Sequence, residues 1–114
     1  MTNPVLPKPK ESDIQRAILE LLAYRRIFAV RVNVGMVPTG AAGKSAWRKS
    51  TMKGMADIIG VLPGGRFLAI EVKAPGGKAT AEQQEFLDAV NKAGGAAFVA
   101  RSTREVEAYL RELA

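Results

Sequence analysis

Three residues near the middle of the sequence have the types and the spacing to bind a metal ion and to act on a water molecule beside it. Asp57 precedes one apolar segment, and Glu71 and Lys73 stand at the end of the next. Side chains alternate between the two faces of a strand, so Glu71 and Lys73 share one face at a separation of roughly 7 Å. A carboxylate can then hold a cation while the ammonium group reaches a water molecule or a phosphate next to it.

The turn between the two apolar segments predicts how the carboxylates meet. The Pro-Gly-Gly sequence at 63–65 separates residues 58–62 from residues 67–72, and this pattern is typical of a β-hairpin. Pairing about the turn places Asp57 opposite roughly Glu71, so two carboxylates could converge on one cation. Because the candidate ligands are all oxygens, Mg²⁺ or Mn²⁺ fits better than zinc.

A plain structural role for the same residues is the alternative. Glu71 and Lys73 would form an exposed ion pair at a strand end, and Asp57 would be a turn residue. However, Glu71 directly follows the apolar run Phe67–Ile70, where a charge costs free energy unless it is paired or coordinated. That position favours a metal site.

The composition bounds the domain organisation and the chemistry. The chain has 114 residues with 47% hydrophobic content, which suits one compact domain. Residues 1–10 contain three prolines and predict a flexible arm, so the single domain is expected over residues 11–114. The absence of cysteine and histidine excludes disulfide scaffolds, imidazole triads and histidine-based zinc sites.

The N-terminal half predicts one helix, one strand and a long loop. Ser12 and Gln15 form a capping-box pattern that starts a helix reaching about Arg26. The following segment alternates like a strand with one buried face, formed by Phe28, Val30 and Val32. Residues 34–54 are rich in Gly, Ala and Lys, and we expect either a binding loop or a disordered segment there.

The C-terminal half predicts a crossover unit and a final helix. Thr80 and Gln83 form a second capping box, and the glycines at 94–95 end that helix. Residues 96–100 are strand-like, and Ser102 caps the last helix. The expected order is αβββαβα, an α/β fold with a mixed central sheet flanked by helices, in which the crossover strands run parallel beside an antiparallel hairpin.

The charge distribution indicates a polyanionic partner. The net charge is +6, and the segment from Arg31 to Lys53 contains five basic residues and no acidic residue. The partner could be DNA, RNA or an acidic surface, and any single lysine in this segment is more often a solvated surface residue. No window is apolar enough to span a bilayer and no signal peptide is visible, so a cytoplasmic protein is expected.

Several motifs, in this order and spacing, resemble the VRR-Nuc domain, which is named for virus-type replication-repair nucleases and belongs to the PD-(D/E)xK superfamily. The motifs are Glu11-Ser-Asp-Ile-Gln15, Arg31-Val-Asn33, Gly54-Met-Ala-Asp57, Glu71-Val-Lys73-Ala-Pro-Gly and Thr80-Ala-Glu-Gln83. The resemblance covers about residues 11–110 and implies a restriction-endonuclease-like αβββαβ core. Ala56 stands where the family often has proline, which should alter backbone stiffness more than chemistry.

The resemblance implies a metal-dependent nuclease site. Asp57, Glu71 and the backbone carbonyl of Val72 would bind the metal, and Lys73 would orient or polarise the attacking water. Two further residues, Glu11 and Gln83, would complete the site. For these two there are simpler roles, because Glu11 is a favourable charge near a helix N-terminus and Gln83 is the capping-box partner of Thr80.

The resemblance also implies DNA contacts to the phosphate backbone from Arg31, Asn33, Lys44, Arg48, Lys49 and Lys53. It further suggests a substrate class and an assembly. A homodimer would present two active sites at a fixed spacing, which suits symmetric branched DNA such as a four-way (Holliday) junction in a DNA repair setting. A bacterial or bacteriophage-infected cell is the expected origin. The competing hypothesis is a non-catalytic basic DNA-binding module with a nuclease-like fold, but such proteins normally lose the acidic ligands that this chain keeps.

Overall fold

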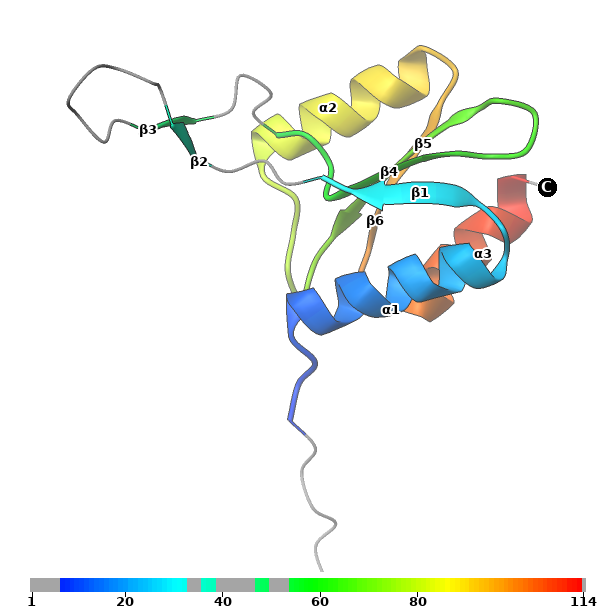
Figure 1. Ribbon diagram of the computed structural model, residues 1–114, viewed down its shortest axis with the longest axis horizontal. Helices are drawn as coiled ribbons and strands as arrows, with labels where there is room; N and C mark the ends of the chain where they lie inside the picture. The colour runs from blue at the N-terminus through cyan, green and yellow to red at the C-terminus, as the bar shows by residue number, and fades with distance from the viewer. Residues whose placement is uncertain (1–6, 33–35, 39–46, 50–53, 114) are drawn as a thin grey trace, which may run out of the picture.

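The computed structural model describes residues 7–32, 36–38, 47–49 and 54–113. Within these ranges the chain forms three helices and six strands (Figure 1). The helices are α1 (Glu11–Tyr24), α2 (Ala81–Lys92) and α3 (Thr103–Leu113). The strands are β1 (Phe28–Arg31), β2 (Met36–Pro38), β3 (Trp47–Lys49), β4 (Ile58–Val61), β5 (Phe67–Val72) and β6 (Ala96–Ala100). The division into an arm and one domain stays a prediction, since residues 1–6 lie outside the described ranges.

A mixed sheet forms the centre of the fold. Its strand order is β1-β4-β5-β6 over the described part of the chain. β4 pairs antiparallel with both β1 and β5, whereas β5 and β6 pair in parallel across the α2 crossover. The predicted hairpin, the parallel crossover and the α/β fold class are therefore confirmed.

Helices cover both faces of this sheet. In Figure 1, α1 and α3 lie below it and α2 lies above it. Alternation along β5 explains the two layers, because Leu68, Ile70 and Val72 are fully buried against α1 and α3 while Ala69 is fully buried on the side of α2. Most of the apolar burial is in the lower layer, where Ile18 of α1 and Val106 of α3 are also completely covered.

The predicted buried face of the first strand is wrong. Phe28 is 69% exposed and Val30 is 43% exposed, whereas Ala29 packs against the lower core. Phe28 and Val30 pair with Val61 and Ile59 on the upper face of the sheet. Since α2 contacts β5 and β6 and leaves β1 uncovered, their side chains reach solvent. Val32 follows the strand and is half-buried.

Both ends of the first helix also differ from the prediction. The N-cap residue is Lys10, whose side chain makes no capping hydrogen bond, so Ser12 lies inside the first turn and the expected capping box with Gln15 does not form. At the other end, Arg26 adopts a positive φ of 59°. The Ile27 N–H donates to the Leu22 carbonyl at 2.9 Å, which closes the helix two residues earlier than predicted.

The long loop predicted between residues 34 and 54 contains a strand pair. β2 and β3 pair antiparallel with Val37 opposite Arg48. Each strand has three residues, which is too short to show an alternating pattern in the sequence. The other parts of that segment, 34–35, 39–46 and 50–53, lie outside the described residues.

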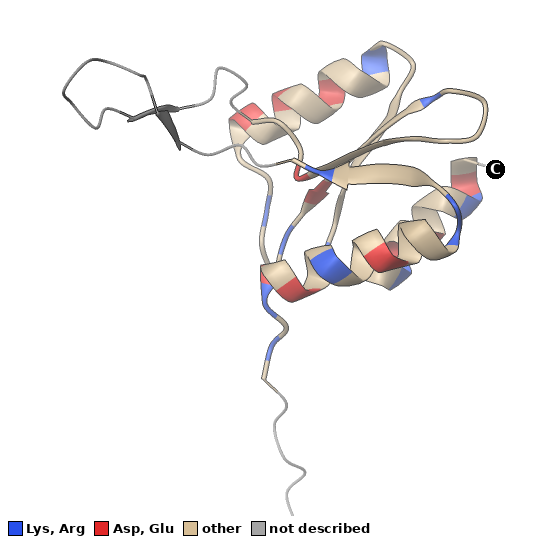
Figure 2. Cartoon of the chain, in the orientation of Figure 1, with Lys and Arg blue, Asp and Glu red and all other residues tan. Residues whose placement is uncertain are grey.

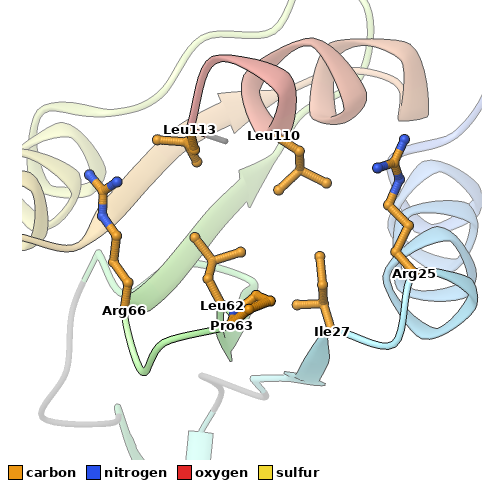
Figure 3. A pocket seen from close by; sticks show the side chains of 7 residues that line it. All are labelled: Arg25, Ile27, Leu62, Pro63, Arg66, Leu110 and Leu113. Carbon is orange, nitrogen blue, oxygen red and sulfur yellow. The ribbon is translucent and has the colours of Figure 1, made fainter.

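An apolar cavity lies at the end of the β4–β5 hairpin remote from Asp57. It has a volume of about 350 Å³ and is lined by Arg25, Ile27, Leu62, Pro63, Arg66, Leu110 and Leu113 (Figure 3). The two arginines stand at its rim, and Arg66 donates to the carbonyls of Gly94 and Gly95 at 3.0 and 3.2 Å. None of the described residues that line it carries a carboxylate, so this cavity lacks the ligands that a hard metal ion needs. None of the described helices is long and apolar enough to cross a membrane.

Candidate active site

The hairpin register brings Asp57 and Glu71 together. Ile58 pairs with Ile70, and one more step along the same register places Asp57 opposite Glu71, as predicted. Figure 2 shows acidic residues where β4 begins and where β5 ends. Lys73 follows two residues after Glu71, and its own N–H donates to the Ala100 carbonyl at 3.0 Å. Backbone pairing among β4, β5 and β6 thus fixes the positions of these side chains.

Direct contacts hold the three side chains in place. The Val72 N–H donates to Asp57 Oδ2 at 2.8 Å, which ties that carboxylate to the backbone between Glu71 and Lys73. The Asp57 carbonyl accepts from the Val32 N–H at 2.7 Å. Lys73 Nζ lies 3.5 Å from Glu71 Oε2. The predicted sharing of one face by Glu71 and Lys73 is confirmed, and their ion pair is buried rather than exposed.

Glu71 is the most strongly perturbed group of the site. Its exposed fraction is 1%, and its Oε1 atom has no hydrogen-bond partner. Burial is the main cause that raises its pKa to about 8, and the neighbouring Asp57 carboxyl raises it further while Lys73 opposes the shift. A buried carboxylate with an unsatisfied oxygen is costly unless it takes up a proton or binds a cation.

The donor set fits a hard divalent cation. Two adjacent carboxylates, one with a free buried oxygen, match the oxygen ligands that Mg²⁺ and Mn²⁺ prefer. Among the described residues there is no group of three or more His, Cys, Asp or Glu side chains that could hold a metal. Two carboxylates can be enough for Mg²⁺, because this ion keeps several waters and takes further oxygens from substrate phosphates.

A polar cavity opens beside Asp57. Its volume is about 310 Å³, and it is lined by Gln15, Arg31, Val32, Gly54, Met55, Asp57 and Gln83. Gln83 also completes the predicted capping box, because its Oε1 accepts from the Thr80 N–H at 2.9 Å while its own N–H donates to Thr80 Oγ1 at 3.2 Å. The two roles considered for Gln83 are thus compatible in one side chain.

Comparison with known proteins identifies the family. A model of the VRR-NUC domain matches residues 9–104 of the 114-residue chain. The chain belongs to the VRR-NUC domain family. This membership gives it a nuclease-type function, with DNA as the substrate. No curated protein and no solved structure matched the chain.

Glu11 is not brought to the acidic pair of this VRR-NUC domain. It is exposed in the first turn of α1. Within the described part of the chain, no hydrogen bond or ion pair joins it to Asp57, Glu71 or Lys73. Its position suits the simpler role, a negative charge at the positive end of a helix dipole.

The basic residues of the VRR-NUC domain are only partly described. Arg31 ends β1 and lines the polar cavity, and its contact with DNA stays a prediction. Arg48 and Lys49 belong to β3, but their side chains lie outside the described residues. The other three candidates, Asn33, Lys44 and Lys53, lie outside the described residues altogether.

Gln15 is a polar residue of this cavity that the sequence did not assign to the site. We expected it to cap α1, but it lies within the helix next to the buried Ile14 and turns toward the cavity. The only signal that could have found it was its place in the Glu11–Gln15 motif, because periodicity alone does not distinguish a half-buried glutamine from a surface one.

Proposed function

We propose that this VRR-NUC protein is an Mg²⁺- or Mn²⁺-dependent endonuclease that hydrolyses phosphodiester bonds of DNA. Asp57, Glu71 and the Val72 carbonyl would hold the metal. The observation that supports this most strongly is the buried Glu71 carboxylate, whose Oε1 has no partner although Asp57 lies beside it. When bound, the metal lowers the pKa of a water molecule and stabilises negative charge on the phosphate.

The residues of the chain itself supply orientation and charge. The Val72 N–H fixes Asp57 Oδ2, so the other carboxylate oxygen is the one left for a ligand. Lys73 Nζ is 3.5 Å from Glu71 Oε2, and its side chain is 15% exposed. An ammonium group at the mouth of the site can donate to the attacking water or to a phosphate oxygen, which positions the water for attack.

The test is metal-dependent cleavage with a matched control. Labelled linear duplex, flap and four-way-junction DNA are incubated with Mg²⁺, Mn²⁺ or EDTA, using the wild type, Asp57→Asn and Asp88→Asn. Asp88 is an exposed carboxylate on α2 that accepts from Gln84 at 2.9 Å, so its substitution removes the same charge away from the site. We expect cutting to cease in EDTA and in Asp57→Asn but to persist in Asp88→Asn. DNA binding without cutting by every form would instead identify a non-catalytic DNA-binding module.

We further propose that the enzyme acts as a homodimer on branched DNA such as four-way junctions. Four large apolar residues support dimerisation: Phe28, Val30, Val61 and Phe67 are 69%, 43%, 42% and 39% exposed. The β1–β4–β5 register places all four on the upper face of the sheet. Exposed apolar patches of this kind are typical of protein interfaces, and a two-fold axis would set the spacing of two active sites.

A further inference from the structure

The polar cavity beside Asp57 continues onto the outer surface of α1. A second cavity of about 160 Å³ is lined by Ser12, Gln15, Arg16, Leu19 and Arg31. Gln15 and Arg31 line both cavities. We call the two together the α1 cleft. It begins at the metal-binding carboxylate and leads away from it, so a strand of a substrate bound at Asp57 could follow it.

The hydrogen bond between Gln83 and Thr80 leaves the amide donor of Gln83 for this cleft. An amide side chain has an acceptor oxygen and a donor nitrogen. Its oxygen accepts from the Thr80 N–H at 2.9 Å, and this hydrogen bond determines the orientation of the amide group. The Nε2 group is therefore the end available to a ligand, which makes Gln83 better suited to an anion than to a metal ion.

The charges along the cleft also select an anion. Arg31 carries a positive charge, and within the described part of the chain no carboxylate lies within ion-pair distance of it. Asp57 at the inner end is the only acidic residue that lines either cavity in the described ranges. Donors from Gln15, Arg31 and Gln83 thus surround a space next to the carboxylate that a cation would neutralise.

A tight backbone contact keeps the cleft wall in place. Gly54 has a φ of +77°, and a Cβ atom at this position would lie 2.5 Å from the Glu82 carbonyl oxygen. Only glycine allows the chain to approach the first turn of α2 so closely. Residues 54–57 are consequently held against the turn that carries Gln83.

We propose that the α1 cleft binds the nucleotide next to the scissile phosphate, with Arg31, Gln15 and the Gln83 amide donating to its phosphate oxygens. The proposal rests on the proposed nuclease function, because Asp57 marks where the scissile phosphate lies. Gln15 and Gln83 are then substrate-binding residues that hold the strand in register with the reacting bond. Neither needs to touch the metal.

The experiment replaces donors by acceptors of the same shape. Gln83→Glu keeps the oxygen that accepts from Thr80, and glutamate is itself a preferred capping-box residue, so the helix should be retained. Gln84→Glu is the control for added charge, because it makes the same charge change one residue away on the exposed side of α2. It also loses the hydrogen bond to Asp88, so melting temperatures are compared with the wild type. Gln15→Glu is an independent variant on another helix. Binding of fluorescein-labelled duplex and junction DNA is measured in EDTA, together with the melting temperature and Mn²⁺ affinity.

We expect Gln83→Glu and Gln15→Glu to weaken DNA binding at least about tenfold relative to Gln84→Glu, because each turns a donor into a repelling carboxylate. Arg31→Ala should lower the slope of log affinity against log salt by about 0.9, the value for one phosphate contact. The melting temperature should stay near that of the wild type, and the Mn²⁺ affinity should not fall. In Mg²⁺, KM should rise while kcat changes little.

Two outcomes separate this proposal from the proposed function. If the wild type cuts DNA but Gln83→Glu and Gln15→Glu bind it as well as Gln84→Glu does, the cleft proposal is overturned and the nuclease stands. If the wild type binds without cutting but these variants still lose affinity, the cleft is supported and the nuclease proposal fails.

Discussion

Replacing Glu71 by glutamine should stabilise the metal-free protein at alkaline pH. Folding raises the pKa of Glu71 from 4.5 to about 8, so the folded state holds the proton more tightly than the unfolded state does. The stability contributed by this group is therefore fully present below pH 4.5 and is lost as the pH rises through 8. Glutamine has the shape of the protonated acid and does not titrate, so the variant should keep that stability.

The size of the effect follows from the pKa difference. One pKa unit corresponds to about 1.4 kcal/mol, so a shift of this size gives at most about 5 kcal/mol at pH 9. Some relaxation around an ionised carboxylate reduces this value, and we expect Glu71→Gln to exceed the wild type by about 1–5 kcal/mol. Near pH 4 the two proteins should have nearly equal free energies of unfolding.

Urea unfolding in EDTA, followed by circular dichroism from pH 4 to pH 9, measures this difference. Asp88→Asn serves as the control for removing an exposed carboxylate. Adding Mn²⁺ should then stabilise the wild type, by about 2.7 kcal/mol at a hundredfold excess over Kd, but not Glu71→Gln. Equal stability of both proteins across the whole pH range in EDTA would refute the reasoning, since it would mean that Glu71 ionises in the folded state at no cost.

Three further substitutions test other parts of the structure. Gly54→Ala should destabilise the fold by roughly 2 kcal/mol or more in urea unfolding, because its Cβ would meet the Glu82 carbonyl. Gly64 also has a positive φ but nothing within 4 Å of an added Cβ, so Gly64→Ala should cost only about 1 kcal/mol. Equal costs would argue against the tight contact at Gly54. Lys73→Arg keeps the charge but not the compact ammonium group, so we expect it to retain partial cleavage activity. The activity of Lys73→Ala should fall to the level seen in EDTA. Full activity of the alanine variant would remove Lys73 from the mechanism. Phe28→Asp should shift the species seen by light scattering from dimer to monomer and abolish any preference for junctions over linear duplex, and an unchanged mass would place the dimer interface elsewhere.

The hairpin and its carboxylates could be predicted because they depend on local rules. Alternation sets which side of β5 Glu71 and Lys73 occupy, and the turn at 63–65 sets the register that brings Asp57 opposite Glu71. The second capping box could also be predicted, since its two hydrogen bonds join Thr80 and Gln83, which are three residues apart in the sequence.

The features that the sequence did not reveal depend on distant packing. The exposure of Phe28 and Val30 follows from how far α2 extends over the sheet, which the alternation within β1 cannot show. Gln15 turns toward the site because α1 packs beside β1, and the same glutamine on another helix would be a surface residue. The early end of α1 depends on Arg26 accepting a left-handed conformation that glycine usually supplies.

The bonds made by Asp57 have a practical consequence for mutagenesis. Its side chain accepts from Val72 in β5, and its carbonyl accepts from Val32 after β1, so one residue joins three neighbouring strands. Alanine at this position would break the side-chain bond as well as remove a ligand, and a loss of activity would then mix misplaced strands with lost chemistry. Asparagine can still offer an oxygen to Val72, which makes it the better choice for an inactive protein intended to trap uncut DNA.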